Sequence, residues 1–93
     1  MGRLGAEFIA MPGHKGLLGP QGTGVLLCRD RARPIMAGGT GSESRNQAMP
    51  ETLPDALEAG THNIPGIAGL LAGLRYVKRR GLESIDAHER KLK

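Results

Sequence analysis

The chain has 93 residues, enough for one small domain at most, and domains of this size bury a modest share of their surface. Its 15 glycines, 6 prolines, single phenylalanine, single tyrosine and lack of tryptophan leave few large side chains to anchor an independent core. With 39% hydrophobic and 24% charged residues, the composition is that of a globular protein and excludes disorder as the default. We therefore expect a piece of a larger protein.

The net charge of +4 comes largely from residues 29–33 and from the C-terminal third, and acidic residues are interleaved in both. With so few aromatic residues among the basic ones, a solvated surface is favoured over a nucleic-acid site. The single cysteine, Cys28, excludes an internal disulfide and a cysteine-based zinc site and favours a reducing compartment. The sequence shows no secretory leader pattern and no membrane-spanning apolar run, so we expect a cytoplasmic protein that binds no membrane.

Two short apolar runs stand near the beginning of the chain. Residues 7–11, EFIAM, end at Pro12 and Gly13 and predict a buried strand. Residues 23–28, TGVLLC, form a continuous apolar run typical of a strand covered on both faces. The first sixty residues offer few helices, so the elements that cover these strands are expected outside this sequence.

Irregular segments follow the second strand. Residues 29–33 predict a polar turn, and residues 38–44, GGTGSES, predict a glycine-rich loop with hydroxyl side chains. Residues 46–55 contain two prolines and predict an extended surface arm without regular structure.

Two helices are predicted in the C-terminal third. Asn63 is suited to cap the first, with Pro65 in its first turn, and the helix should stop near Gly81 after three cations. Its expected core-packing stripe, at spacings of three and four, comprises Ile67, Leu70, Leu71, Leu74 and Val77. The second helix has a thinner apolar stripe, formed by Leu82, Ile85 and Leu92.

The stretch from Gly13 to Gly24, GHKGLLGPQGTG, holds a lysine on an unusually bare backbone. Such a lysine serves two chemistries, the cradling of a phosphate and the formation of a Schiff base with a carbonyl compound. The spacing disfavours a phosphate-binding P-loop, because Lys15 is followed by Gly16 and a strand rather than by Ser or Thr and a helix. In general, however, a glycine-flanked lysine is more often a solvent-exposed loop residue.

Three segments in order carry a resemblance to a known family: GHKGLLGPQGTG, then GGTGS, then MPETLPDALEAGTHNIPGIAGLLAGL. Together they resemble the class V aminotransferases, pyridoxal-phosphate enzymes of fold type I, and among them the cysteine desulfurase and selenocysteine lyase group. The similarity runs from about Leu4 to Leu92. It implies an α/β fragment of the large domain, with a strand-and-loop region at 1–62 and helices leading towards the small domain at 63–93.

The resemblance also implies roles for particular residues. Lys15 matches the lysine that forms the Schiff base with pyridoxal phosphate and later moves the substrate proton. His14 matches a residue that helps to hold the cofactor phosphate. Thr40 matches a hydroxyl donated to the cofactor phosphate of the neighbouring subunit, which implies a homodimer. His14 as a plain turn residue and Thr40 as a plain loop hydroxyl are the alternatives.

Departures from the family pattern are also visible. Pro12 stands where the family has a Ser or Thr that contacts the phosphate, and His62 replaces the proline of a GTPN element that Thr61 and Asn63 match. The aspartate of the pyridine nitrogen, the ring-stacking residue, the sulfur-accepting cysteine and the carboxylate-binding arginine would all lie outside this sequence. Cys28 is instead expected to be a small buried hydrophobe.

The resemblance therefore implies a fragment of a cysteine desulfurase-like enzyme, inactive alone, whose substrate is cysteine or selenocysteine. The alternatives are a class V aminotransferase or lyase that acts on another amino acid, and a non-catalytic truncated piece that binds anions or a complementary chain. The isolated residues His62 and His88 have no third ligand at metal spacing, so no metal site is expected.

Overall fold

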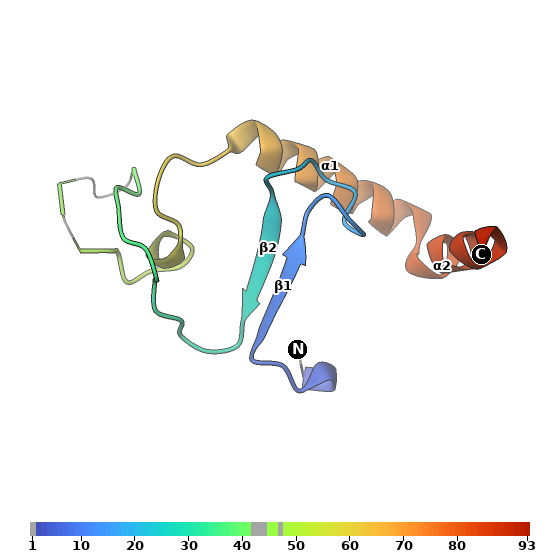
Figure 1. Ribbon diagram of the computed structural model, residues 1–93, viewed down its shortest axis with the longest axis horizontal. Helices are drawn as coiled ribbons and strands as arrows, with labels where there is room; N and C mark the ends of the chain where they lie inside the picture. The colour runs from blue at the N-terminus through green and yellow to red at the C-terminus, as the bar shows by residue number, and fades with distance from the viewer. Residues whose placement is uncertain (1, 42–44, 47) are drawn as a thin grey trace. The chain divides into compact units, whose positions relative to one another are not determined.

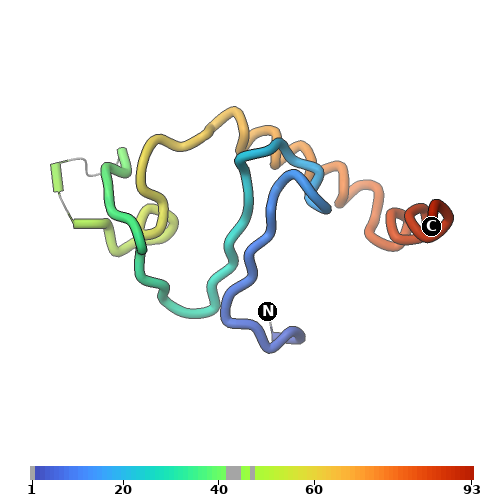
Figure 2. Tube along the Cα trace, viewed as in Figure 1, coloured from blue at the N-terminus to red at the C-terminus, as the bar shows by residue number. Residues whose placement is uncertain are grey.

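The computed structural model describes residues 2–41, 45–46 and 48–93. Two strands are followed by two helices, with glycine-rich loops between the strands and after them, and this order confirms the predicted α/β arrangement (Figures 1 and 2). The elements are the short 3-10 helices η1 (Gly2–Leu4) and η2 (Asp55–Leu57), the strands β1 (Phe8–Pro12) and β2 (Gly24–Cys28), and the helices α1 (Ile64–Arg80) and α2 (Leu82–Leu92).

The described residues divide into two compact units. The first combines the residues up to Phe8 with Cys28–His62, and the second combines Ile9–Leu27 with Asn63–Lys93. The division into a strand-and-loop region at 1–62 and a helical region at 63–93 stays a prediction.

Strands β1 and β2 pair into a two-stranded antiparallel hairpin. The Gly13 amide donates to the Thr23 carbonyl at 2.7 Å at one end, and the Arg29 amide donates to the Glu7 carbonyl at 2.8 Å at the other. The residue numbers of the two bonded pairs have the same sum, so the register is uniform along the hairpin. The strands lie within one residue of the predicted ranges.

The described residues do not bury the two strands, and their burial by elements outside this sequence stays a prediction. No residue of β1 or β2 is buried, and exposed and half-buried positions alternate along β1. Leu26 is 52% exposed and Phe8 47% exposed. Cys28 is half-buried, short of the full burial expected. The physical reason is that α1 packs on the loop between the strands, so the strand faces gain no cover from the described residues.

Helix α1 begins and ends where the sequence predicts. The Asn63 side chain accepts a hydrogen bond from the Gly66 amide at 3.0 Å, and Pro65 occupies the first turn, where its missing N–H costs nothing. At the other end Gly81 has a φ of 83°, and its amide donates to the Val77 carbonyl at 2.9 Å. The left-handed region suits glycine and stops the helix there.

The predicted stripe of α1 is buried only in part: Leu70 is buried and Val77 is half-buried, while its other members are exposed. Leu70 is 6% exposed and is the buried hydrophobic residue of the described chain, and it lies between two buried glycines, Gly66 and Gly73. Ile67 and Leu71 remain 49% and 47% exposed. The buried face therefore combines Leu70 of the stripe with glycines, because these small residues let the loop backbone approach the helix.

Helix α2 follows α1 directly and contacts it. Of its predicted stripe only Ile85 is half-buried, while Leu82 and Leu92 are 75% and 74% exposed. An ion pair between Arg90 and Asp86, 2.9 Å long, joins neighbouring turns on the solvent side. Within the described ranges, no helix has the length and apolar character that crossing a bilayer requires.

Candidate functional site

Lys15 lies in the turn that follows β1, within the second unit. The Leu18 amide donates to the Lys15 carbonyl at 2.9 Å, and the Gly19 amide donates to the Gly13 carbonyl at 2.7 Å. With the bond from Gly13 to Thr23, these contacts close the backbone on both sides of the lysine. The lysine is therefore held by main-chain bonds, and its own side chain is not needed to fix the turn.

Glycine is required at two points of this turn. A Cβ at Gly13 would collide with the Thr23 hydroxyl and lie 2.8 Å from the Thr23 carbonyl oxygen. A Cβ at Gly19 would lie 2.7 Å from the Leu70 side chain. Leu18 adopts a φ of 54°, a conformation that residues other than glycine rarely adopt. The turn is thus too tightly folded to accept ordinary side chains at either glycine.

Helix α1 supports the turn from one side, and Figure 1 shows the loop between β1 and β2 running along this helix. A Cβ at Gly73 would lie 2.5 Å from the carbonyl oxygens of both Leu17 and Leu18, and a Cβ at Gly69 would lie 3.1 Å from the Pro20 ring. The glycine face of α1 therefore brings helix and loop backbones into direct contact, and it positions the lysine turn.

The side chains of His14 and Lys15 are both exposed at the tip of this turn. In the part of the chain that the structure describes, neither has a hydrogen-bond or ion-pair partner. A lysine amine presented in this way can react with a carbonyl compound without first breaking an internal contact.

Thr40 lies in the first unit, in the loop after the polar turn. It is 7% exposed and is the buried polar side chain of the described residues. Gly41, next to it, has a φ of 86°. The expected loop at 38–44 is described only up to Gly41, and residues 42–44 lie outside the described residues. The phosphate-binding role of Thr40 stays a prediction.

The backbone of the Thr40 loop is attached to the segment that precedes α1. The Gly60 amide donates to the Gly39 carbonyl at 2.7 Å, and the Gly38 amide contacts the Met49 sulfur at 3.4 Å. His62 Nδ1 lies 3.0 Å from Glu58 Oε2. From the sequence, His62 was interpreted as an isolated residue. Its four-residue spacing from Glu58 was the signal that could have revealed this partner.

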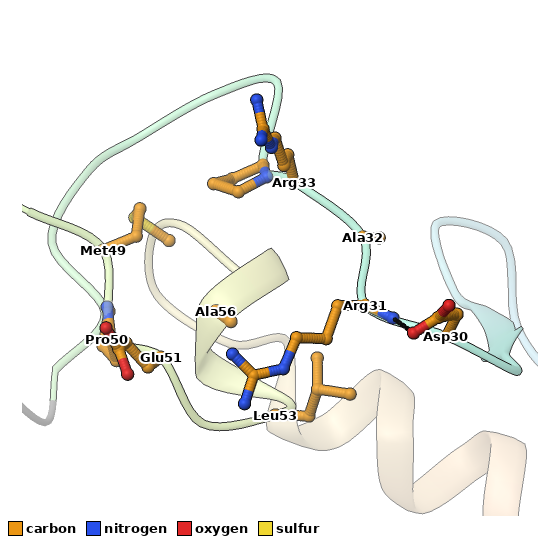
Figure 3. Close-up of a pocket in the computed structure, with 10 residues that line it drawn as sticks. Asp30, Arg31, Ala32, Arg33, Met49, Pro50, Glu51, Leu53 and Ala56 are labelled. Carbon is orange, nitrogen blue, oxygen red and sulfur yellow. Dashed lines mark hydrogen bonds between the residues drawn. The ribbon is translucent and has the colours of Figure 1, made fainter.

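A cavity of about 600 Å³ also lies in the first unit. Figure 3 shows the Arg31 side chain extending beside Leu53 and Ala56, whereas Arg33 points away from them. The Arg31 amide donates to the Asp30 carboxylate at 2.8 Å, as expected for a polar turn. Neither Lys15 nor Thr40 lines this cavity. Its lining includes two arginines, two carboxylates and no nucleophile, so the cavity offers no evident catalytic chemistry.

Comparison with known families matches residues 1–93 to aminotransferase class-V. The lysine turn on its glycine-bearing helix is thus part of a known fold, and the chain belongs to the class V aminotransferase family, which confirms the resemblance found in the sequence.

The relatives are named cysteine desulfurases. The chain is 42% identical over 95 residues to a probable cysteine desulfurase of Methanothermobacter thermautotrophicus, covering 96% of this chain and 24% of that protein. It is 40% identical over 96 residues to a probable cysteine desulfurase of Pyrococcus abyssi, covering 97% of this chain and 24% of that protein. The chain therefore spans about a quarter of the length of the curated relatives that it matches.

A solved structure supports the same relationship. The apo structure of the cysteine desulfurase from Thermococcus onnurineus NA1 matches 88% of this chain and 22% of that chain, with 38% sequence identity and a TM-score of 0.66. The two strands, glycine-rich loops and two helices thus form a fragment of that α/β fold, as the sequence predicted.

Proposed function

We propose that this chain is the lysine-bearing part of a pyridoxal-phosphate enzyme that acts on amino acids, and that the whole protein is a cysteine desulfurase. The observation that carries the proposal is Lys15, presented without an internal partner at the tip of a turn closed by backbone bonds. The relatives named cysteine desulfurase support the reaction type. The substrate on this proposal is cysteine, with selenocysteine as the close analogue.

The described residues fit such a cofactor. The Lys15 amine is exposed and has glycine close to it on both sides, so an aldehyde can approach it without a steric barrier. Lys15 would hold the cofactor covalently through Nζ. His14 on the same turn would hold the phosphate from one side, and Thr40 of the neighbouring subunit would donate to it in a homodimer.

Bound in this way, the cofactor supplies a conjugated ring that takes up electrons from the substrate Cα–H bond. The chain's own contribution is made by Lys15. With substrate bound, its Nζ would accept the substrate Cα proton and return it later in the reaction. The main-chain bonds that close the turn fix where the Lys15 backbone lies, and this positioning would contribute to the rate.

The remaining catalytic groups of the family lie outside this sequence, so the 93-residue chain by itself is inactive on this proposal. Without a carboxylate at the pyridine nitrogen the ring is a weak acceptor of electrons, and without a nucleophilic cysteine the sulfur has no acceptor. The single half-buried Cys28 is compatible with a reducing, cytoplasmic location for the protein.

The test is to locate the cofactor on the intact protein. Reduction with borohydride makes the bond between lysine and cofactor permanent, and digestion with mass spectrometry then identifies the modified residue. We expect the pyridoxyl mass on Lys15. It should be lost in Lys15→Ala and retained in Lys78→Ala, which removes an exposed lysine of α1. A pyridoxyl group on another lysine, or on none, would contradict the proposal.

A second candidate is an aminotransferase or lyase that acts on another amino acid, and the family match to aminotransferase class-V favours keeping it. Products separate the two: a desulfurase converts cysteine to alanine and transferable sulfur, whereas a transaminase produces a keto acid. If the intact protein binds no pyridoxal phosphate at all, the non-catalytic alternative is favoured.

A further inference from the structure

The segment from Glu58 to His62 forms a braced turn. His62 Nδ1 lies 3.0 Å from Glu58 Oε2, across three intervening residues. The turn lies outside the α-helices, so no ladder of main-chain bonds holds these two residues at this distance. Gly60, at its centre, has a φ of 103° and gives the backbone no stiffness of its own. The side-chain pair therefore spans the bend at Gly60, in addition to the main-chain bond that the Gly60 amide makes.

The braced turn lies against the loop that carries Thr40. The Gly60 amide donates to the Gly39 carbonyl at 2.7 Å, one residue before Thr40. A Cβ built on Gly38 would contact the Ala59 side chain at 3.5 Å, so the two backbones run close together over at least two residues. All of these residues belong to the first unit. The conformation of the turn thus determines where the Gly39 carbonyl, and the residue after it, can lie.

His62 stands where the family pattern noted above has a proline. A proline restricts φ covalently through its ring. A histidine leaves φ free, but bonding of Nδ1 to a carboxylate limits the same backbone by a different route. The pair thus restricts the backbone through a side-chain contact where a proline would restrict it covalently.

We propose that the Glu58–His62 pair is a positioning device for the Thr40 loop, which sets this loop to receive the phosphate of the cofactor. The inference rests on the proposed function. Neither residue is a catalytic residue on this view, because each acts through the Gly60–Gly39 bond. The side chains of His62 and Glu58 are 32% and 49% exposed, so solvent weakens the pair and its effect is limited to about fivefold in affinity.

The experiment measures dissociation constants of the intact protein, freed of cofactor, for two probes: pyridoxal 5′-phosphate and pyridoxal, which lacks the phosphate. In His62→Ala and in Glu58→Ala we expect the constant for the phosphate-bearing probe to rise two- to fivefold. The constant for pyridoxal should stay within experimental error. The double variant should resemble either single variant, because one interaction is lost in all three.

Two further variants guard against a general loss of structure. Glu58→Gln keeps an oxygen that can accept from His62 Nδ1 and should recover most of the affinity for the phosphate-bearing probe. His88→Ala removes an exposed histidine of α2 and should change neither constant.

Three outcomes would overturn the inference. Equal weakening for both probes would mean that the pair only supports the fold, and no change for either probe would mean that the pair does not position the loop. If the wild-type protein binds neither probe, the proposed function is wrong and the inference falls with it.

Discussion

The glycine face of α1 makes a strong prediction about Gly73. In Gly73→Ala, the new Cβ would lie 2.5 Å from the carbonyl oxygens of Leu17 and Leu18 and 2.7 Å from the carbonyl carbon of Leu18. These are backbone atoms, so the clash cannot be relieved by a rotamer change. The loop that carries Lys15 has to move away from the helix, or the helix has to move away from the loop.

The magnitude follows from two opposing effects. Alanine is favoured over glycine inside a helix by about 1 kcal/mol. Overpacking of a close contact costs about 1–3 kcal/mol. We therefore expect Gly73→Ala to lower the free energy of unfolding by up to about 2 kcal/mol. The same substitution at a helix position that does not contact the loop would raise it.

Gly69→Ala is the matched control, because it lies on the same helix one turn earlier. Its new Cβ would lie 3.1 Å from two carbons of the Pro20 ring, a contact that a small shift of the ring relieves. We expect Gly69→Ala to be as stable as the wild type or more so. Denaturant unfolding of the intact protein measures both variants, and borohydride labelling of Lys15 reports whether the turn has moved.

One result would refute this reasoning. If Gly73→Ala is more stable than the wild type and its Lys15 is labelled at the same rate, the helix and the loop do not make the close contact described. Packing against the loop would then not require glycine at position 73, and α1 would not position the lysine.

Two other predictions concern the N-terminal cap of α1 and the exposed apolar side chains of the chain. Asn63→Ala removes the acceptor of the Gly66 amide and should lower the free energy of unfolding by about 1 kcal/mol, whereas Asn63→Asp, which keeps a capping oxygen, should lower it less; equal losses in the two variants would argue against the cap. The 93-residue chain expressed alone should bind a dye specific for exposed apolar surface, since Ile64, Ile67 and Leu71 are about half exposed or more and Leu70 is its buried hydrophobic residue. A chain that binds no dye and unfolds cooperatively would show that it buries these side chains by itself.

Local signals in the sequence account for the elements that were predicted well. The limits of α1 depend on Asn63, Pro65 and Gly81, each of which acts on its own backbone or on residues within one turn. Strand β1 ends at Pro12, just before Gly13, for the same reason. The family was also evident from the sequence, because each of the three motifs that carry the resemblance consists of residues close together along the chain.

The surfaces that these elements bury could not be predicted in this way. The periodicity of α1 marked Ile67, Leu71 and Leu74 as core, yet these side chains are exposed, because the loop at 17–20 packs on the neighbouring glycine face. Hydrophobic spacing shows that a face is apolar, but not which partner covers it. The strand faces were expected to be covered by elements outside this sequence, and the residues that the structure describes leave them uncovered.

The sequence alone was thus sufficient for the two helices and the family, since each is written in residues that are near one another along the chain, while Lys15 as the reactive lysine stays a prediction. Tertiary structure decided that Lys15 is held by main-chain bonds on a glycine-lined helix, and that Glu58 and His62 close a turn against the Thr40 loop. Those arrangements depend on how closely two backbones approach. That distance is set by packing between segments that are remote in sequence, so no local sequence pattern predicts it.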